Sequence, residues 1–424
     1  MLADQVARGR LSIQDQVTLS GMWLGLNFQS SALLPIVVPA QVLLLIDRGA
    51  VASSHQALAV SALSLAAAII AVAVTPLAGA ASDHLKTRFG RRRQLIVAGI
   101  ALAVLGQAGL AATFPLVLFI AGFAIVQVGT NVATAAYQGL LPDLVQPSQR
   151  GAASGWLGFM TLLGSVGSLA AAGALLGSAT PGPSLGADVT RGALFFYALA
   201  AVVLVLCTAV TVLGVAEGPS VAAPPHPWFD LFQHQPFRVV FGARALVMIG
   251  LTLFLTYIEY YLAATNGATA FVGATVAIAL LALFGALASS LVLGMASDRI
   301  PRVRIVIAAN LAMAAAAWIF VFAPAHLPLA PLGVLFGLGY GAYLSVDWAL
   351  AIDSLPTRAS SARDLGIFTV SINLPSLIAP ALGGLVILLA TAAGIGSLAY
   401  RLVFTLAAVS LLLGVVVVRR IRFA

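Results

Sequence analysis

Long apolar runs, separated by short polar segments, extend over almost the whole chain. Arg93 and Asp143 enclose 49 residues that contain no Asp, Glu, Lys or Arg. Because a helix needs about 20 residues to cross the hydrocarbon core of a bilayer, this run predicts two crossings joined by a short turn at 113–115. Backbone amides in hydrocarbon find no water to bond with, so each crossing is expected to be a helix.

The same pattern along the chain predicts twelve membrane-spanning helices and therefore an all-α membrane protein. Hydrophobic residues make up 61% of the chain and charged residues only 8%, with a mean hydropathy of +1.07. About a quarter of the residues in a soluble domain are charged, so a soluble fold is excluded. The expected spans are 17–45, 56–81, 94–112, 116–139, 151–177, 192–214, 239–263, 270–296, 304–323, 329–353, 365–390 and 400–418.

The net charge of +8 is distributed according to topology. With the N-terminus inside, 18 of the 21 Lys and Arg residues fall on one side of the membrane, and only Arg48, Arg191 and Arg401 fall on the other. This bias predicts an inner (plasma) membrane protein with both termini in the cytoplasm. A basic inner face suits anionic lipid. We therefore expect the lipid bilayer and a small-molecule substrate as partners, no nucleic acid, and a monomer.

A polar, proline-rich segment at 217–237 interrupts the apolar pattern and is typical of a linker. It divides the chain into two predicted six-helix bundles, 1–216 and 238–424, joined by a cytoplasmic connection.

The two predicted bundles repeat short motifs. Gly-Ala-Ala-Ser-Asp at 79–83 matches Gly-Met-Ala-Ser-Asp at 294–298, which lies 215 residues later. Leu-Pro at 141–142 matches Leu-Pro at 355–356, 214 residues later. Two matches at nearly the same offset indicate pseudo-symmetric halves, with a substrate site expected between them near the midplane.

The segment 79–93 resembles a loop signature of a known family. It combines Asp83 with five basic residues, and it resembles the loop between the second and third helices of the major facilitator superfamily. The spacing between Asp83 and the basic residues is similar to that in glycoside-pentoside-hexuronide cation symporters and sucrose/proton symporters. The segments 345–350 and 364–366, and Asp353, also resemble these symporters. The superfamily resemblance covers essentially the whole chain. It implies a secondary transporter with two six-helix bundles, rocker-switch alternating access and no cofactor.

The chain departs from the melibiose-type symporters, which carry cation-binding aspartates inside helices of the N-terminal half. In this half every aspartate, for example Asp47, Asp83 and Asp143, lies outside the predicted spans or at their ends. Sodium coupling of that kind is therefore not expected, and the predicted coupling ion is a proton.

Charged residues at the inner ends of the spans are predicted to act as a gate. A charge network there would form in one orientation of the halves and break in the other. Topology and lipid anchoring are the alternative, and in neither case are these residues substrate ligands. The expected gating residues are Asp83, Arg88, Arg91, Arg92, Asp298, Arg299, Asp353 and Arg363.

Two carboxylates lie inside predicted spans, where such groups are costly and are functional candidates. Glu259 lies toward the outer end of the seventh span, and Asp347 lies on the cytoplasmic side of the middle of the tenth. Both are predicted to couple protons. The alternatives are an interfacial carboxylate for Glu259 and, for Asp347, an inner-gate pair with an arginine, which nearby Asp353 and Arg363 support. An organic-anion substrate ranks lower, because it would want a central Arg and Arg244 is close to a span end.

Polar residues recur at helical spacing on spans one, four, ten and eleven. Amides and phenols can donate to or accept from hydroxyl groups, so they suit a neutral hydroxylated ligand. Aromatic side chains can stack on a sugar ring, although they also serve as interface anchors. The expected substrate-binding residues are Asn27, Gln41, Gln127, Asn131, Tyr257, Tyr260, Tyr343, Trp348 and Asn373.

The sequence has no Walker loop, no clustered metal ligands and no Ser with a partnered His, so neither ATP-driven transport nor an enzyme is expected. The prediction is a proton-coupled symporter of a sugar or glycoside. A hydrophobic-drug/proton antiporter and a non-transporting sensor with the same fold are the alternatives. Gly333, Gly337 and Gly341 are expected to pack against a neighbouring helix, and Pro35 and Pro39 to kink the first span.

Overall fold

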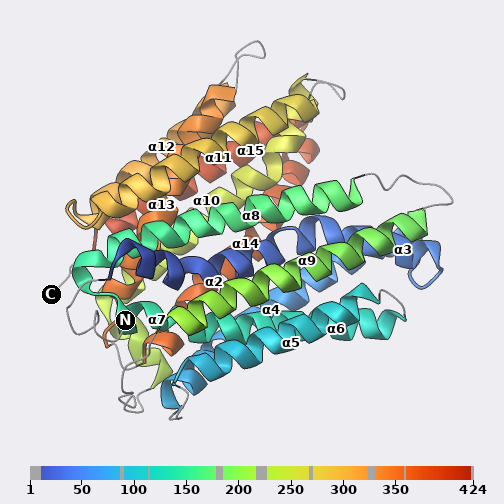
Figure 1. The fold of residues 1–424 in the computed structure, drawn as a ribbon. Helices are drawn as coiled ribbons and strands as arrows, with labels where there is room; N and C mark the ends of the chain where they lie inside the picture. The colour runs from blue at the N-terminus through green and yellow to red at the C-terminus, as the bar shows by residue number, and fades with distance from the viewer. Residues whose placement is uncertain are drawn as a thin grey trace. The chain divides into compact units, whose positions relative to one another are not determined.

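A computed structural model describes residues 11–85, 90–112, 115–177, 185–215, 227–266, 271–322, 330–357 and 360–421. Within these ranges twelve helices are long and apolar enough to cross a membrane, and no strand occurs (Figure 1). The predicted fold class and the number of spans are therefore confirmed.

The helices follow the hydrophobic runs and often extend beyond them. The helix of the seventh span, for example, begins at Gln235 rather than at 239, because a helix continues past the hydrocarbon, whereas the apolar pattern ends with it. Each span is one helix, except that α2, η1 and α3 form the first span and α6 is followed by the short α7. The elements are α2 (Ile13–Ser31), η1 (Leu33–Val37), α3 (Val38–Asp47), α4 (Gln56–His84), α5 (Arg93–Ala111), α6 (Leu116–Gln138), α7 (Leu140–Leu144), α8 (Arg150–Leu176), α9 (Leu185–Gly214), α10 (Gln235–Asn266), α11 (Phe271–Ala296), α12 (Arg302–Phe322), α13 (Ala330–Asp353), α14 (Ser361–Ala392) and α15 (Ala399–Val418).

The first span is interrupted where the two prolines fall. Pro35 lies inside η1, which is one turn of π-helix, and Pro39 lies at the start of α3. The amides of Ile36 and Val37 both donate to the carbonyl of Ala32, at 3.1 and 3.0 Å. Pro35 has no amide to continue the α-helical ladder, so the turn widens at this point.

The contacts divide the chain into two units. Unit 1 comprises Met1–Gln146, Met160–Pro224 and Thr357–Ile367. Unit 2 comprises Pro147–Phe159, Pro225–Pro356 and Phe368–Ala424. The first turns of α8 therefore belong to unit 2, and the first turns of α14 belong to unit 1. Residues 217–226 of the predicted linker lie outside the described residues.

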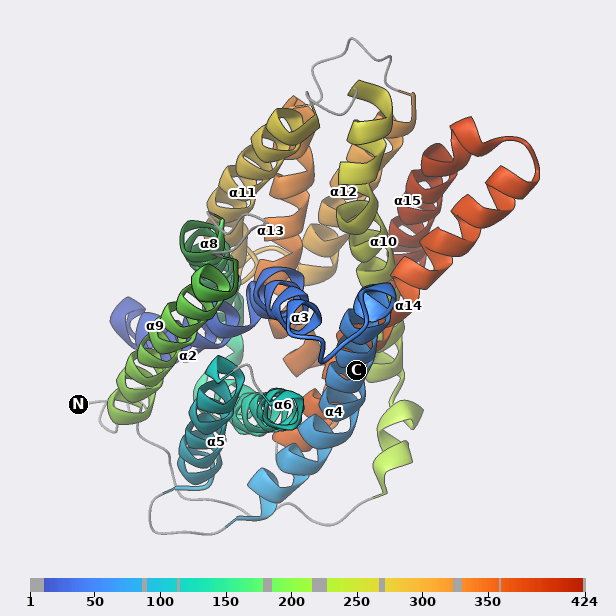
Figure 2. The same ribbon diagram turned by 90° about the vertical axis from the view of Figure 1, so that its right-hand side faces the viewer.

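Helix packing inside the two units repeats. In unit 1, α2 packs on α9, α5 on α6, and α4 on α6. In unit 2 the helices six spans later pair in the same way, so that α10 packs on α15, α12 on α13, and α11 on α13. The pairs α5–α6 and α11–α13 are visible in Figure 2. Each unit therefore has the same internal plan, which confirms the pseudo-symmetric six-helix bundles.

Glycines allow α11 and α13 to approach closely. A Cβ on Gly337 of α13 would lie 1.9 Å from the carbonyl oxygen of Ala282 in α11. A Cβ on Gly333 or Gly341 would also clash with the α11 backbone. The predicted packing face of α13 is confirmed, and it brings the backbones of α11 and α13 into close contact.

Candidate functional site

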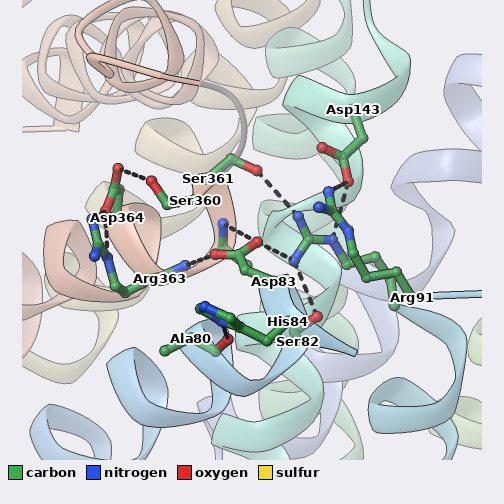
Figure 3. A network of polar contacts seen from close by, with 12 residues as sticks. Ala80, Ser82, Asp83, His84, Arg91, Asp143, Ser360, Ser361, Arg363 and Asp364 are labelled. Carbon is green, nitrogen blue, oxygen red and sulfur yellow. Dashed lines mark hydrogen bonds and ion pairs between the residues drawn. The ribbon is translucent and has the colours of Figure 1, made fainter. Parts of the chain in front are cut away.

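Two clusters of charged side chains lie at corresponding places in the two units. Both lie where α4, α6–α7, α11 and α13 end and the following helices begin. This is the side predicted to be cytoplasmic, and we refer to it as the inner side. The unit 1 cluster comprises Asp83, Arg91, Arg92, Asp143 and the first turn of α14 (Figure 3). The unit 2 cluster comprises Asp298, Arg302, Asp353 and the first turn of α8.

Asp83 caps the start of α14 in unit 1. Its carboxylate accepts the backbone N–H groups of Ala362 and Arg363, at 3.3 and 2.9 Å. It also accepts a hydrogen bond from Nη1 of Arg92 at 2.7 Å. The first amides of a helix have no partner inside the helix and carry partial positive charge, so a buried carboxylate stabilises them.

Arg92 connects three elements within this cluster. Its guanidinium is fully buried, donates from Nε to Asp143 at 3.0 Å, and donates from Nη2 to the hydroxyl of Ser361 at 3.2 Å. Arg91 forms a second ion pair with Asp143 at 2.7 Å. Gly139 makes room for the guanidinium, because a Cβ there would lie 2.5 Å from Cζ of Arg92.

The unit 2 cluster follows the same plan. Asp298 accepts the backbone N–H groups of Gly151 and Ala152, at 2.7 and 3.0 Å, and so caps the start of α8. Arg302 pairs with Asp353 and lies 3.5 Å from Asp298. Arg150 also pairs with Asp353, at 2.6 Å. In each unit, an aspartate that ends one span caps a helix that belongs mostly to the other unit.

The predicted gating residues are only partly those that the structure brings together. Arg363 contributes its backbone amide, while its side chain pairs with Asp364 at 2.7 Å. Arg299 is exposed, and Arg302 occupies the place expected for it, which corrects that prediction. Arg88 lies outside the described residues.

Three members of the clusters were not predicted as gating residues: Asp143, Arg150 and Arg302. A second offset relates two of them to predicted residues. Asp143 and Asp353 are 210 residues apart, as are Arg92 and Arg302. This offset differs from the 214 and 215 residues of the motifs, so extending the motif repeat alone does not identify them.

A buried ion pair lies inside the helices of unit 2. Asp347 of α13 lies 2.7 Å from Nη2 of Arg244 in α10, and it accepts a hydrogen bond from the hydroxyl of Tyr343 at 3.0 Å. Both charged side chains are almost fully buried, at 3% and 4% exposure. The arginine that pairs with Asp347 is Arg244. Arg244 was expected near the end of its span, but its side chain is buried among helices.

Two aromatic rings flank the guanidinium of Arg244. Its Cζ lies 5.0 Å from the ring centre of Trp348 and 4.4 Å from that of Phe368. Such cation–π contacts hold a guanidinium in a desolvated place. Its Nε and Nη1 have no hydrogen-bond partner among the described residues.

The aromatic cluster near the outer end of α10 is mainly structural. The hydroxyl of Tyr257 donates to the carbonyl of Pro380 at 2.6 Å, and its ring fills the space beside Gly383. Tyr257 thus provides a hydrogen-bond donor for the carbonyl of a proline inside α14. We do not include it among the proposed substrate residues. Tyr260 and Glu259 are exposed.

The polar residues of unit 1 divide into two groups. Gln41 is buried, donates to the carbonyl of Leu110 at 2.8 Å and accepts from the hydroxyl of Tyr197 at 2.6 Å. Its amide is therefore used in packing, which corrects its assignment to the substrate site.

The other polar candidates retain some exposure. Asn131 of α6 is half-buried, accepts from the hydroxyl of Thr75 at 2.9 Å and donates to the carbonyl of Gln127. Asn27 donates to the carbonyl of Trp23 within its own helix. In unit 2, Asn373 of α14 is half-buried.

Comparison with known proteins adds a family and a fold. The sequence profile of the family described as MFS/sugar transport protein matches residues 53–418. The comparison with curated protein sequences finds no match.

Similar solved structures include transporters of different substrates. One is a bacterial homologue of the iron transporter ferroportin in an outward-facing state, with a TM-score of 0.71 and 15% identity over 97% of this chain and 99% of that one. Another is a proton:xylose symporter, with a TM-score of 0.70 and 15% identity over 95% and 94%. A human organic anion transporter has a TM-score of 0.67 and 16% identity over 96% and 100%. At these identities the likeness concerns the fold alone.

Proposed function

The chain belongs to the MFS/sugar transport protein family, and from this premise we propose that it is a secondary active transporter that carries a sugar or glycoside together with a proton. Transport would proceed by rocker-switch alternating access. The observation that carries the proton coupling is the buried contact of Asp347 with Arg244 and Tyr343.

Asp347 is suited to exchange a proton because its negative charge is paired with the buried positive charge of Arg244. A carboxylate inside a span is costly unless it is paired, and Arg244 provides the pairing charge. Protonation of Asp347 would leave Arg244 as an uncompensated buried cation. The protonated state therefore favours another arrangement, so proton uptake and a conformational or binding step are linked.

The two inner-side clusters support the proposed rocking. Asp83 holds the first turn of α14, and Asp298 holds the first turn of α8. The remainder of each of these helices belongs to the other unit. A helix that swings with the rest of its unit has to leave its cap, so we propose that both clusters form in one transport state and break in the other.

The proposed sugar substrate rests on side-chain chemistry and on the family description. Asn27, Gln127 and Asn131 of unit 1 offer amides that are partly exposed. In unit 2, Tyr343 and Trp348 lie beside the ion pair. Amides, phenols and an indole suit hydroxylated rings, which they bind by hydrogen bonding and stacking.

We also propose the inner membrane as the location, with both termini cytoplasmic. The family and the twelve apolar helices make the chain a multi-pass membrane protein. The orientation is supported by the 18 of 21 basic residues that the topology places on one side.

Proton flux in liposomes tests the function. Protein reconstituted with a pH-sensitive dye inside is given sugars and glycosides one at a time, without a membrane potential. The lumen should become acidic only with transported solutes, and Asp347→Asn should abolish the proton movement while leaving solute exchange. Solute uptake by the wild type without any proton movement would contradict coupling.

Glu259→Gln is the matched comparison, because it removes the other carboxylate within a span. We propose Asp347 as the coupling group, since Glu259 is exposed and has no ion partner in the part of the chain that the structure describes. Loss of proton flux in Glu259→Gln with normal flux in Asp347→Asn would reverse this assignment.

A further inference from the structure

The side chain of Arg244 has more hydrogen-bonding capacity than unit 2 uses. A guanidinium has five N–H donors, and within the described residues the single ion partner of this one is Asp347, at Nη2. Nε and Nη1 are buried and lack a partner within the described ranges. Leaving a buried polar group without a partner is unfavourable, and more so when the group is charged.

The contact between Arg244 and Asp347 is also suited to replacement of Asp347 by another acceptor. The two side chains lie 2.7 Å apart, yet Oδ2 of Asp347 accepts no aligned hydrogen bond from the described residues. The pair is therefore held by charge rather than by a bidentate hydrogen-bonded fork. Trp348 and Phe368 keep the guanidinium in place whether or not Asp347 is ionised, because they contact the cation directly.

We propose that the transported solute carries a carboxylate, and that this carboxylate replaces Asp347 on Arg244. A carboxylate is an acceptor-only group with two oxygens, which matches the unused donors of a planar guanidinium. A neutral hydroxyl would satisfy one donor but would not balance the charge. The proposal rests on the proton-coupled transport proposed above and names the substrate class for it.

The charges balance through the exchange. In the resting site Arg244 is positive and Asp347 is negative. When Asp347 takes up one proton, its contact with Arg244 loses its charge, and a solute carboxylate restores neutrality. Without that proton, two carboxylates would repel one another beside a single cation. One proton therefore enters with one carboxylate, and no other charge has to move.

The place of the pair within the membrane agrees with a substrate site. Arg244 lies nine residues after the start of α10, and Asp347 lies six residues before the end of α13. At 1.5 Å per residue these positions are roughly 9–14 Å from the inner ends of the helices. A purely anchoring arginine would instead lie at a helix end, where its charge reaches water.

The test compares pairs of probes that differ only in a carboxylate. Gluconate is compared with glucitol, and lactate with propane-1,2-diol, by the thermal unfolding of the full-length protein in detergent at constant ionic strength. A ligand that binds only the folded state raises the melting temperature. We expect the carboxylate members to stabilise the protein and the matched alcohols to have no effect.

Proton linkage gives a second expected result. If the carboxylate binds only when Asp347 is protonated, its apparent affinity should rise about tenfold for each unit by which the pH falls, while Asp347 is mostly ionised. In Asp347→Asn, which resembles the protonated state, this dependence on pH should disappear. Arg244→Gln should abolish the stabilisation, and the double variant Arg244→Gln/Asp347→Asn, in which neither charge is left unpaired, serves as the folding control.

Equal stabilisation by glucitol and gluconate would overturn the proposal, as would gluconate or lactate stabilisation that persists in Arg244→Gln. No stabilisation by either carboxylate in the wild type would also count against it. The liposome assay separates this failure from that of the proposed function. Proton flux driven by neutral sugars would retain coupled sugar transport and reject the carboxylate, whereas the absence of proton flux with every solute would reject both.

Discussion

Removal of one partner of the Arg244–Asp347 pair should destabilise the protein far more than removal of both. Each side chain is at most 4% exposed, so a single substitution leaves an uncompensated charge among helices. Breaking a buried pair in this way costs about 3–5 kcal/mol, whereas replacing both partners is often close to neutral. Asp347→Asn and Arg244→Gln should each lower the free energy of unfolding by that amount.

The two single variants should differ in their response to pH. In Arg244→Gln, the remaining carboxylate escapes its unfavourable place by taking up a proton. In Asp347→Asn, the remaining arginine has no such escape, because a guanidinium does not lose its proton in this range. The loss in Arg244→Gln should therefore shrink as the pH falls, while the loss in Asp347→Asn should not.

Denaturant unfolding in detergent, followed by tryptophan fluorescence, measures these differences. The double variant should lose less than either single variant, and the two single losses together should exceed the double loss by at least about 3 kcal/mol. Glu259→Gln, at an exposed position, should change the stability by less than about 0.5 kcal/mol. Additive losses in the double variant would refute the reasoning, because they would show that the two charges do not compensate one another.

Three further predictions concern the clusters and the helix contacts. Asp83→Asn should destabilise the inner-side contacts by about 3–5 kcal/mol and Asp298→Asn by less, because Arg92 is fully buried whereas Arg302 is 13% exposed. Labelling of a cysteine introduced on the inner side should increase more in the first variant. Gly151→Ala should also increase this labelling, since its Cβ would lie 2.1 Å from Oγ of Ser297, whereas Gly173→Ala in the same helix meets open space and should not. Gly337→Ala should lower the melting temperature by clashing with α11, while Gly242→Ala, also in open space, should stabilise the protein by about 0.4–1 kcal/mol.

Hydrophobic length was sufficient to predict the helices, because the bilayer imposes one scale on every span. The small-residue face of α13 was also predictable, since three glycines at a spacing of four leave one side of a helix without side chains. The ends of the helices were less predictable. α9 begins at Leu185 rather than at 192, because the apolar signal does not register the turns that extend past the hydrocarbon.

The hydrogen-bond partners of the buried polar groups were harder to predict from the sequence. Helical spacing gives the face of a residue but not the helix that this face meets. Gln41 lies in an apolar run as a substrate residue would, yet its amide is used by Leu110 and Tyr197. Likewise, Arg299 follows Asp298 directly in the sequence, which suggested that the two interact. The next helix starts with Arg302, however, and it is the side chain of Arg302 that lies against Asp298 and Asp353.

The repeat shows which charges belong to the shared scaffold. The offset of 210 residues that relates Asp143 to Asp353 also relates Tyr137 to Asp347. Tyr137 is buried in unit 1, where its hydroxyl donates to the carbonyl of Leu19 at 2.7 Å and its ring stacks on Trp23. The same place between the first and fourth spans of a unit is thus neutral in unit 1 and charged in unit 2.

This difference agrees with the two roles that we propose for charge. The inner-side clusters occur in both units, as the proposed rocking motion requires. The interior pair occurs once among the described residues, in unit 2, as the proposed coupling of one proton to one solute requires. Tyr137→Asp would place a second carboxylate at the equivalent position without an arginine. It should destabilise unit 1 without adding a second coupled proton, which the liposome flux assay measures directly.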